Sequence, residues 1–370
     1  MTRGMGSDAR LDDLLRFLVD RRGSDLHLKV GSAPHVRIDG DLQASPFPAL
    51  TAADTERLAY EVLPSARADE FDVSGEADVA LDRPELGRFR VNVYRQRGTI
   101  ALVLRAVTPG IPSFETLGLP PVVRTLASEQ RGLVLVTGPT GSGKTTTIAS
   151  MIDHINATRA VNIVTIEDPI EVLHRDKRSI VSQREIGNDT AGFAEAMRRV
   201  LRQDPDVIFV GEMRDPETVW AALAAAETGH LVLSTLHTTN AVETVNRIVD
   251  FFPADQHRQV RLSLATTLRG VVSQRLVTRA GADGGRVPVV EVLVNTGRVF
   301  DRIADPSVDG DSIEEIMADG EFYGMQTFDQ SVLRLLRDGV IGMREATAAA
   351  SSPSDLRVAM QREGVSPASL

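Results

Sequence analysis

The residues best suited to chemistry lie at positions 138–145, where the chain reads Gly-Pro-Thr-Gly-Ser-Gly-Lys-Thr. This stretch follows the apolar run 133–136 and precedes a segment that can form a helix. A glycine-rich turn between a strand and a helix lets backbone N–H groups point at phosphate oxygens, and the helix adds the positive end of its dipole. The spacing G-x-x-x-x-G-K-[ST] therefore predicts a site for ATP or GTP.

Within this site, Lys144 is expected to reach the β- and γ-phosphates, and the hydroxyl of Thr145 is expected to hold Mg²⁺. The sequence thus predicts ATP and Mg²⁺ as the bound groups. The residues expected to surround the phosphates are Gly138, Pro139, Thr140, Gly141, Ser142, Gly143, Lys144, Thr145 and Thr146.

Acidic side chains follow two later apolar runs. The run 163–166 leads into a stretch containing Glu167 and Glu171, and the run 207–210 leads into Gly211 and Glu212. Phosphoryl transfer needs a placed Mg²⁺ and a group that orients the attacking water. We expect Glu167 to position metal or water, with Glu171 as the alternative, and Glu212 to act as the general base or to orient the water. An acidic surface turn and a helix-start glutamate are the simpler interpretations.

Two histidines, His230 and His237, flank a fourth apolar run at 231–235. If that run is a strand, they lie at its opposite ends, about 20 Å apart, which argues against a shared zinc ion. One imidazole could sense the γ-phosphate while the other supports the site. A structural role for each histidine remains the alternative.

These residues need a scaffold that brings them together. The apolar runs at 133–137, 163–166, 207–210 and 231–235 are separated by helix-like segments such as 146–157 and 216–227. Apolar strands alternating with helices predict an α/β fold, with a parallel sheet covered on both faces. Ligands of such sheets bind at the carboxyl ends of the strands, and each of the four runs is followed there by polar residues suited to chemistry.

The preceding part of the chain has a different pattern. Leucines at helical spacing near residue 11, a helix at 51–63, and alternating segments at 25–43 and 89–104 predict a small α+β domain over residues 1–108. Residues 109–115 form a Pro- and Gly-rich linker, and 116–280 the nucleotide-binding core. We expect 281–370 to be mostly helical with a frayed tail, and amphipathic helices at 260–275 and 327–337.

Composition narrows the possible functions. A formal net charge of −10 gives no indication of a nucleic-acid partner, and the absence of cysteine excludes disulfides and thiolate metal sites. We find neither a signal-peptide core nor an apolar run long enough for a membrane span. The expected location is therefore the cytoplasm, with no direct membrane insertion and peripheral attachment through a partner.

The motifs taken together resemble those of the secretion-ATPase superfamily and, within it, the type IV pilus retraction ATPases (PilT-like). A glycine at 211 in place of an acid is usual in that superfamily. The resemblance covers nearly the whole chain. The matching segments are 24–28, 87–92, 96–98, 138–145, 166–171, 210–215, the His230/His237 pair and 324–330.

This resemblance implies a homohexameric ring with a PAS-like amino-terminal domain, a RecA-like P-loop ATPase core and nucleotide between the two. It implies that Arg90 and Arg105 contact phosphate, which suits a guanidinium delivered by domain closure. Arg198 and Arg202, four residues apart, would share one helical face and relay the nucleotide state or pair across subunits. The implied function is pilus retraction, through a platform protein at the inner face of the cytoplasmic membrane.

Other functions stay open at this stage. Pilus-assembly and secretion motors of the superfamily usually carry an additional amino-terminal domain and a four-cysteine zinc element, which this chain lacks, and Met213 is typical of the retraction type. In contrast, the stretch 295–301 departs from the Ala-Ile-Arg motif that retraction requires in the family. An assembly or secretion motor, or a ring that binds ATP without hydrolysing it, is the alternative.

Overall fold

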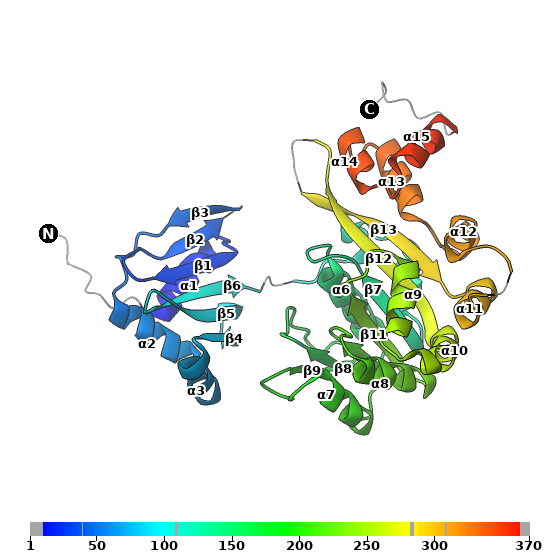
Figure 1. Cartoon of the computed structure of the whole chain (residues 1–370). Coiled ribbons are helices and arrows are strands. Elements are labelled where there is room, and N and C mark those ends of the chain that lie inside the picture. Colours follow the sequence, from blue (N-terminus) through cyan, green and yellow to red (C-terminus); the bar gives the residue numbers. More distant parts are fainter. Residues whose placement is uncertain (1–9, 39, 108–109, 282–284, 308, 363–370) are drawn as a thin grey trace. The chain divides into compact units, whose positions relative to one another are not determined.

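The computed structural model describes residues 10–38, 40–107, 110–281, 285–307 and 309–362 (Figure 1). The chain divides into two compact units, Met1–Gly110 and Ile111–Leu370. Each unit has its own sheet, with six strands in the first and seven in the second. Among the described residues, none of the helices combines the length and apolar character needed to cross a bilayer.

The first unit is an antiparallel sheet with helices packed on one face. Its strand order is β3-β2-β1-β6-β5-β4. The helices are α1 (Leu11–Asp20), α2 (Ala52–Val62) and α3 (Ser65–Ser74). The strands are β1 (Asp25–Lys29), β2 (His35–Ile38), β3 (Asp41–Ala44), β4 (Glu76–Arg83), β5 (Gly87–Gln96) and β6 (Thr99–Ala106).

Alternation along β1 explains the two faces of this sheet. Leu26 and Leu28 are buried in a core shared with the leucines of α1 and α2, whereas Asp25, His27 and Lys29 point to the other face. Helix α2 begins where the sequence indicates, since Thr51 and Asp54 form a reciprocal capping box. The two predicted hairpins and helices α1 and α2 are present. The sequence reading missed β3, α3 and β4.

The second unit is a mixed sheet of order β13-β12-β7-β11-β10-β8-β9, in which β13 alone runs antiparallel to its neighbour. Its strands are β7 (Gly132–Thr137), β8 (Asn162–Glu167), β9 (Ile180–Glu185), β10 (Val207–Val210), β11 (Leu231–Leu236), β12 (Leu268–Thr278) and β13 (Arg286–Val294). The four strands predicted from apolar runs are β7, β8, β10 and β11. They pair in parallel, as expected for a sheet covered on both faces.

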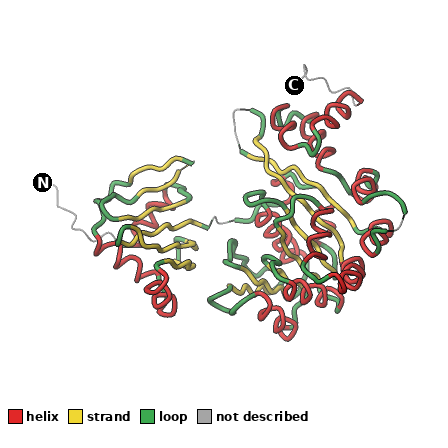
Figure 2. Tube along the Cα trace, viewed as in Figure 1, coloured by secondary structure: helices red, strands yellow, loops and turns green. Residues whose placement is uncertain are grey.

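Helices cover both faces of this sheet (Figure 2). Along β7, Leu133 and Leu135 pack into the core on one face, and Val134 and Val136 into the core on the other. The helices are α4 (Phe114–Leu117), α5 (Pro121–Ala127), α6 (Lys144–Thr158), α7 (Phe193–Val200), α8 (Pro216–Glu227), α9 (Ala241–Asp250), α10 (His257–Thr267), α11 (Gly297–Ala304), α12 (Ile313–Ala318), α13 (Phe328–Arg337), α14 (Met343–Ala349) and α15 (Pro353–Arg362). Three single-turn 3₁₀ helices are η1 (Leu201–Gln203), η2 (Ala254–Gln256) and η3 (Glu321–Tyr323).

One expectation about the carboxy-terminal half was wrong, and a second overlooked a strand. The helix expected at 260–275 ends at Thr267, and the chain continues as strand β12. The region after 280, expected to be mostly helical, begins with the valine-rich strand β13. Branching at Cβ favours strands over helices, and a strand buried on both faces lacks the alternation that identifies it in the sequence. Helices α11–α15 occupy the remainder, as expected.

Candidate nucleotide-binding site

The glycine-rich loop joins β7 to α6. Gly138 has φ of 142°, and a Cβ there would lie 2.4 Å from the carbonyl oxygen of Gln274, so no larger residue fits. Gly143, with φ of 92°, turns the chain into α6, whose first residue is Lys144. The Oγ of Ser142 is buried in this loop with no hydrogen-bond partner in the described chain. A cradle of amides with an unpartnered hydroxyl fits phosphate oxygens.

Lys144 lies over this loop. Its Nζ donates to the carbonyl oxygens of Gly138, at 2.7 Å, and Pro139, at 3.1 Å. Burial lowers the pKa of Lys144, while the carboxylates of Glu212 and Glu171 act in the opposite direction. The lysine is thus within electrostatic reach of acids that follow two other strands. Thr145 and Thr146 are exposed at the first turn of α6.

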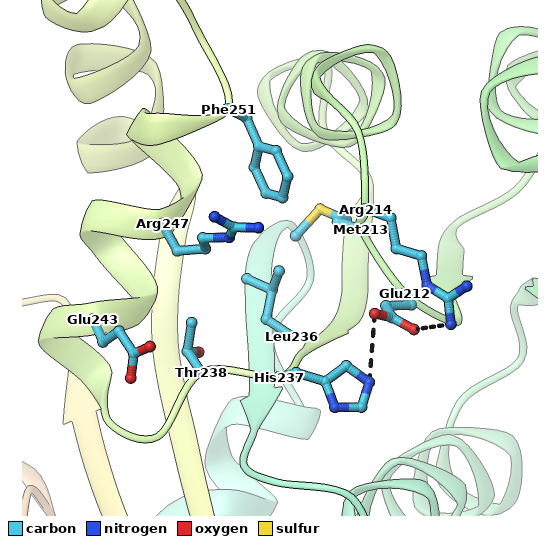
Figure 3. A pocket seen from close by; sticks show the side chains of 9 residues that line it. All are labelled: Glu212, Met213, Arg214, Leu236, His237, Thr238, Glu243, Arg247 and Phe251. Atoms are coloured by element: carbon cyan, nitrogen blue, oxygen red, sulfur yellow. Dashed lines mark ion pairs between the residues drawn. The ribbon is translucent and has the colours of Figure 1, made fainter.

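Glu212 follows β10 and lies in a cavity of about 340 Å³ (Figure 3). Its Oε2 is 2.7 Å from Nη2 of Arg214, and its Oε1 is 3.4 Å from Nε2 of His237. Arg247 of α9 and Phe251, which directly follows that helix, also line the cavity, with the guanidinium 4.9 Å from the ring centre. The predicted general base is therefore held between two nitrogen groups. The sequence reading singled out His237 and missed Arg214, which stands only two residues after Glu212.

The two glutamates of the acidic stretch after β8 differ in environment. Glu167 is 8% exposed, and its Oε1 accepts hydrogen bonds from Thr165 Oγ1 at 2.7 Å and Gln183 Nε2 at 3.0 Å. Burial raises the pKa of Glu167 despite these bonds. Glu171, rather than Glu167, is the member whose charge acts on Lys144. This arrangement favours Glu171 over the preferred Glu167 as the group beside the phosphates.

His230 lies away from this group. It immediately precedes β11, whereas His237 follows that strand, so His230 is at the amino-terminal edge of the sheet. Its Nδ1 is 2.9 Å from the carbonyl oxygen of Ala225 and 3.2 Å from Oγ1 of Thr228, at the end of α8. The expectation that His230 contributes to the nucleotide site of its own chain is corrected. The contacts of its imidazole with the end of α8 indicate a structural role for His230.

Arg198 and Arg202 do not share a helical face. Helix α7 ends at Val200, and Arg202 lies in the tighter turn η1, which leads to Asp204 with φ of 52°. A 3₁₀ turn rotates side chains away from the 3.6-residue period on which the expectation depended. Arg198 is 3.0 Å from Glu217 at the start of α8. Arg202 precedes β10 and so lies toward the amino-terminal edge of the sheet.

The remaining two predicted arginines belong to the first unit. Arg90 on β5 and Arg105 on β6 stand directly opposite each other in the antiparallel pair. Nε of Arg105 is 2.7 Å from Oδ1 of Asp25 on β1, and the Arg105 side chain is 65% exposed. The sequence reading did not identify Asp25 as a partner of this arginine.

Residues 87–308 match the family described as type II/IV secretion system protein. The chain is 41% identical over 345 residues to the "type IV pilus retractation ATPase PilT" of Pseudomonas aeruginosa, covering 93% of this chain and 99% of that protein. The chain belongs to the type II/IV secretion system protein family.

Further members of the family agree with this assignment. A "twitching motility protein" of Neisseria gonorrhoeae is 41% identical over 323 residues, covering 87% of this chain and 86% of that protein. The crystal structure of the pilus retraction motor PilT with bound ADP superposes with a TM-score of 0.87 at 45% identity, covering 95% of this chain and all of that one. The predicted fold class, a RecA-like core preceded by a PAS-like α+β unit, is confirmed.

Proposed function

We propose that this chain is an ATPase motor that drives type IV pilus retraction. The observation that carries the proposal is the meeting of three strand ends around the glycine-rich loop. Lys144 follows β7, Glu171 follows β8, Glu212 follows β10, and both carboxylates act on the lysine. The choice of retraction over assembly is supported by the relatives, which are named for pilus retraction and twitching motility.

In the proposed mechanism, the loop 138–146 grips the triphosphate of ATP through its amides and Lys144. Mg²⁺ bound with the nucleotide would neutralise developing phosphate charge, and the hydroxyl of Thr145 would hold it, with Glu171 or Glu167 ordering its water. Glu212 accepts the proton of the attacking water. His237, at 3.4 Å from that carboxylate, keeps it oriented toward the γ-phosphate side.

The amino-terminal unit supplies the arginines of this proposal. Arg90 and Arg105 stand side by side on adjacent strands, so movement of that unit carries both guanidinium groups together. Their delivery to the γ-phosphate stabilises the charge of the transition state, and their withdrawal after hydrolysis couples chemistry to motion. We propose that the motor works as a homohexamer on a platform protein at the cytoplasmic face of the inner membrane.

Phosphate release by the purified chain tests hydrolysis directly. We expect Mg²⁺-dependent turnover, binding of ATP but a loss of roughly a hundredfold or more in rate for Glu212→Gln, and loss of binding for Lys144→Ala. Turnover that persists in Glu212→Gln would remove that residue from the mechanism. Wild-type protein that binds ATP without turnover would indicate a regulatory ring instead.

A deletion strain tests the direction of the motor. Cells that lack a retraction motor accumulate surface pili and lose twitching, whereas cells that lack an assembly motor are bald. We expect the first phenotype and its reversal by the wild-type gene, but not by the gene for Glu212→Gln. Bald cells would assign the chain to pilus assembly or secretion.

A further inference from the structure

The sheet of the amino-terminal unit carries a row of charged residues across four adjacent strands. Asp25 on β1 pairs in register with Arg37 on β2 and with Arg105 on β6, and Arg105 pairs in register with Arg90 on β5. Residues directly opposite in neighbouring strands project to the same face. This face is the one that helices α1 and α2 leave uncovered, since the leucines of β1 point the other way.

Asp25 and Arg105 differ sharply in exposure. The Asp25 side chain is 5% exposed and that of Arg105 is 65% exposed. Oδ1 of Asp25 accepts a hydrogen bond from Nε of Arg105 at 2.7 Å, and Oδ2 accepts one from Oγ of Ser24 at 2.7 Å. Nε of Arg37 lies 3.8 Å from Oδ2. A carboxylate that engages Nε leaves both terminal amino groups of a guanidinium available to a second anion.

The row also contains a repulsion that Asp25 offsets. Arg90 and Arg105 are like charges placed directly opposite each other, which is unfavourable in an antiparallel pair. Burial acts to raise the pKa of Asp25, but the hydrogen bonds from Ser24 and Arg105 and the charge of Arg105 outweigh it, so the net shift is downward. Asp25 therefore stays ionised beside the arginines. An ionised carboxylate at this position holds Arg105 through the 2.7 Å contact with its Nε.

We propose that Asp25 is a positioning residue, which fixes the Arg105 guanidinium on the open face of the sheet so that its terminal amino groups meet the γ-phosphate. This inference rests on the proposed function, in which Arg105 contacts phosphate. Asp25 itself touches no substrate. Its contribution is to reduce the rotamer freedom of a long, exposed side chain before the transition state forms.

The test is a double-mutant cycle on hydrolysis by the full-length protein. The variants are Asp25→Asn, Arg105→Gln and the two combined, with kcat and KM for ATP measured for each. We expect each single change to lower kcat about tenfold or more, with KM changed less than about threefold, because the contact strengthens in the transition state. The double variant should be no slower than Arg105→Gln, since Asp25 acts only through that arginine.

Asp54→Asn is the matched control. Asp54 is another carboxylate of the same unit, 8% exposed, and it serves the capping box of α2 away from the arginine row. Its loss should lower the melting temperature of the unit and leave kcat within about twofold of wild type. If Asp25→Asn hydrolyses like Asp54→Asn while Arg105→Gln is impaired, the positioning role is wrong and the proposed function stands. An additive double variant overturns the inference in the same way.

Two further outcomes are distinguishable. If Arg105→Gln hydrolyses normally, the phosphate role of Arg105 fails, and the inference fails with it. If Asp25→Asn does not fold, Asp25→Glu replaces it, because the added methylene keeps the charge but displaces the guanidinium. A folded Asp25→Glu with kcat lowered at least threefold supports the inference, and one with wild-type kcat overturns it.

Discussion

Nη2 of Arg214 lies 2.7 Å from Oε2 of Glu212, while the other carboxylate oxygen faces His237. The contact with Glu212 raises the pKa of Arg214, so the guanidinium is a permanent cation at this position. The Glu212 side chain is 19% exposed and that of Arg214 is 63% exposed, so an outer arginine holds an inner carboxylate. Figure 3 shows the two side chains meeting at the edge of the cavity.

Arg214→Met should therefore lower kcat about three- to tenfold with little change in KM, because the carboxylate loses the partner that fixes its orientation. Methionine keeps the approximate length of the side chain and removes only the charge and the hydrogen bond. Steady-state phosphate release over a range of ATP concentrations measures both constants. A faster variant would show that Arg214 withholds the carboxylate from the water instead of orienting it.

The two histidines make a second, paired prediction. His237→Gln should slow hydrolysis tenfold or more without altering the melting temperature, since it contacts Glu212 and is half exposed. His230→Gln should lower the melting temperature and leave kcat nearly unchanged, because the imidazole connects the end of α8 to the start of β11. The pair separates a role at the nucleotide from a role in the fold. Equal losses of kcat would contradict the placement of His230 at the far edge of the sheet.

Elements could be predicted from the sequence where the pattern that specifies them lies within the element itself. The loop 138–145, the strands β7, β8, β10 and β11, and helix α8 could be predicted because each has a continuous pattern or a capping residue within a few positions. Strands β12 and β13 could not be predicted. Their pattern of burial comes from neighbours distant in the chain, including β7 and helix α13, and not from a period within the strand.

Partnerships between side chains were the least predictable part of the site. Asp25 meets Arg105 because β1 and β6 pair, although 80 positions separate the two residues. Gln183 reaches Glu167 because β9 lies beside β8. The preference between Glu167 and Glu171 depends on which of them is buried, and the five residues 167–171, which include both glutamates, contain no such information. Register and burial, both tertiary properties, determine these partnerships.

The acidic stretch leads to a prediction on magnesium. Glu171→Gln should tighten binding of ATP in the absence of Mg²⁺, because a negative charge near Lys144 and the triphosphate is removed. It should also reduce the gain in affinity that Mg²⁺ brings. Glu167→Gln is the control, since its carboxylate is buried and engaged by Thr165 and Gln183. Calorimetric titration with and without the metal compares the two, and a larger effect for Glu167→Gln would restore the original preference.

Glu291 on β13 gives a prediction on stability. It is 6% exposed, and its Oε1 accepts a hydrogen bond of 2.8 Å from the backbone N–H of Ala241, the first residue of α9. Burial raises its pKa to about 7; Glu314 adds to the rise, and the bond to Ala241 and the charge of Arg275 oppose it. The unfolded chain releases this proton near the ordinary value of 4.5. The contribution of Glu291 therefore lowers the free energy of unfolding progressively as the pH rises from about 4.5 to about 7. Above that range this loss of stability is constant.

Glu291→Gln removes that penalty while keeping an oxygen for the N–H of Ala241. The variant should match wild type near pH 4.5 and exceed its free energy of unfolding by on the order of 3 kcal/mol at pH 8. The signal of Trp220, the only tryptophan, can be followed during denaturant unfolding. It reports on the second unit, which also contains Glu291, because Trp220 lies in α8. A stability difference that does not change with pH would mean that Glu291 titrates at its ordinary value, so that the buried carboxylate is ionised throughout.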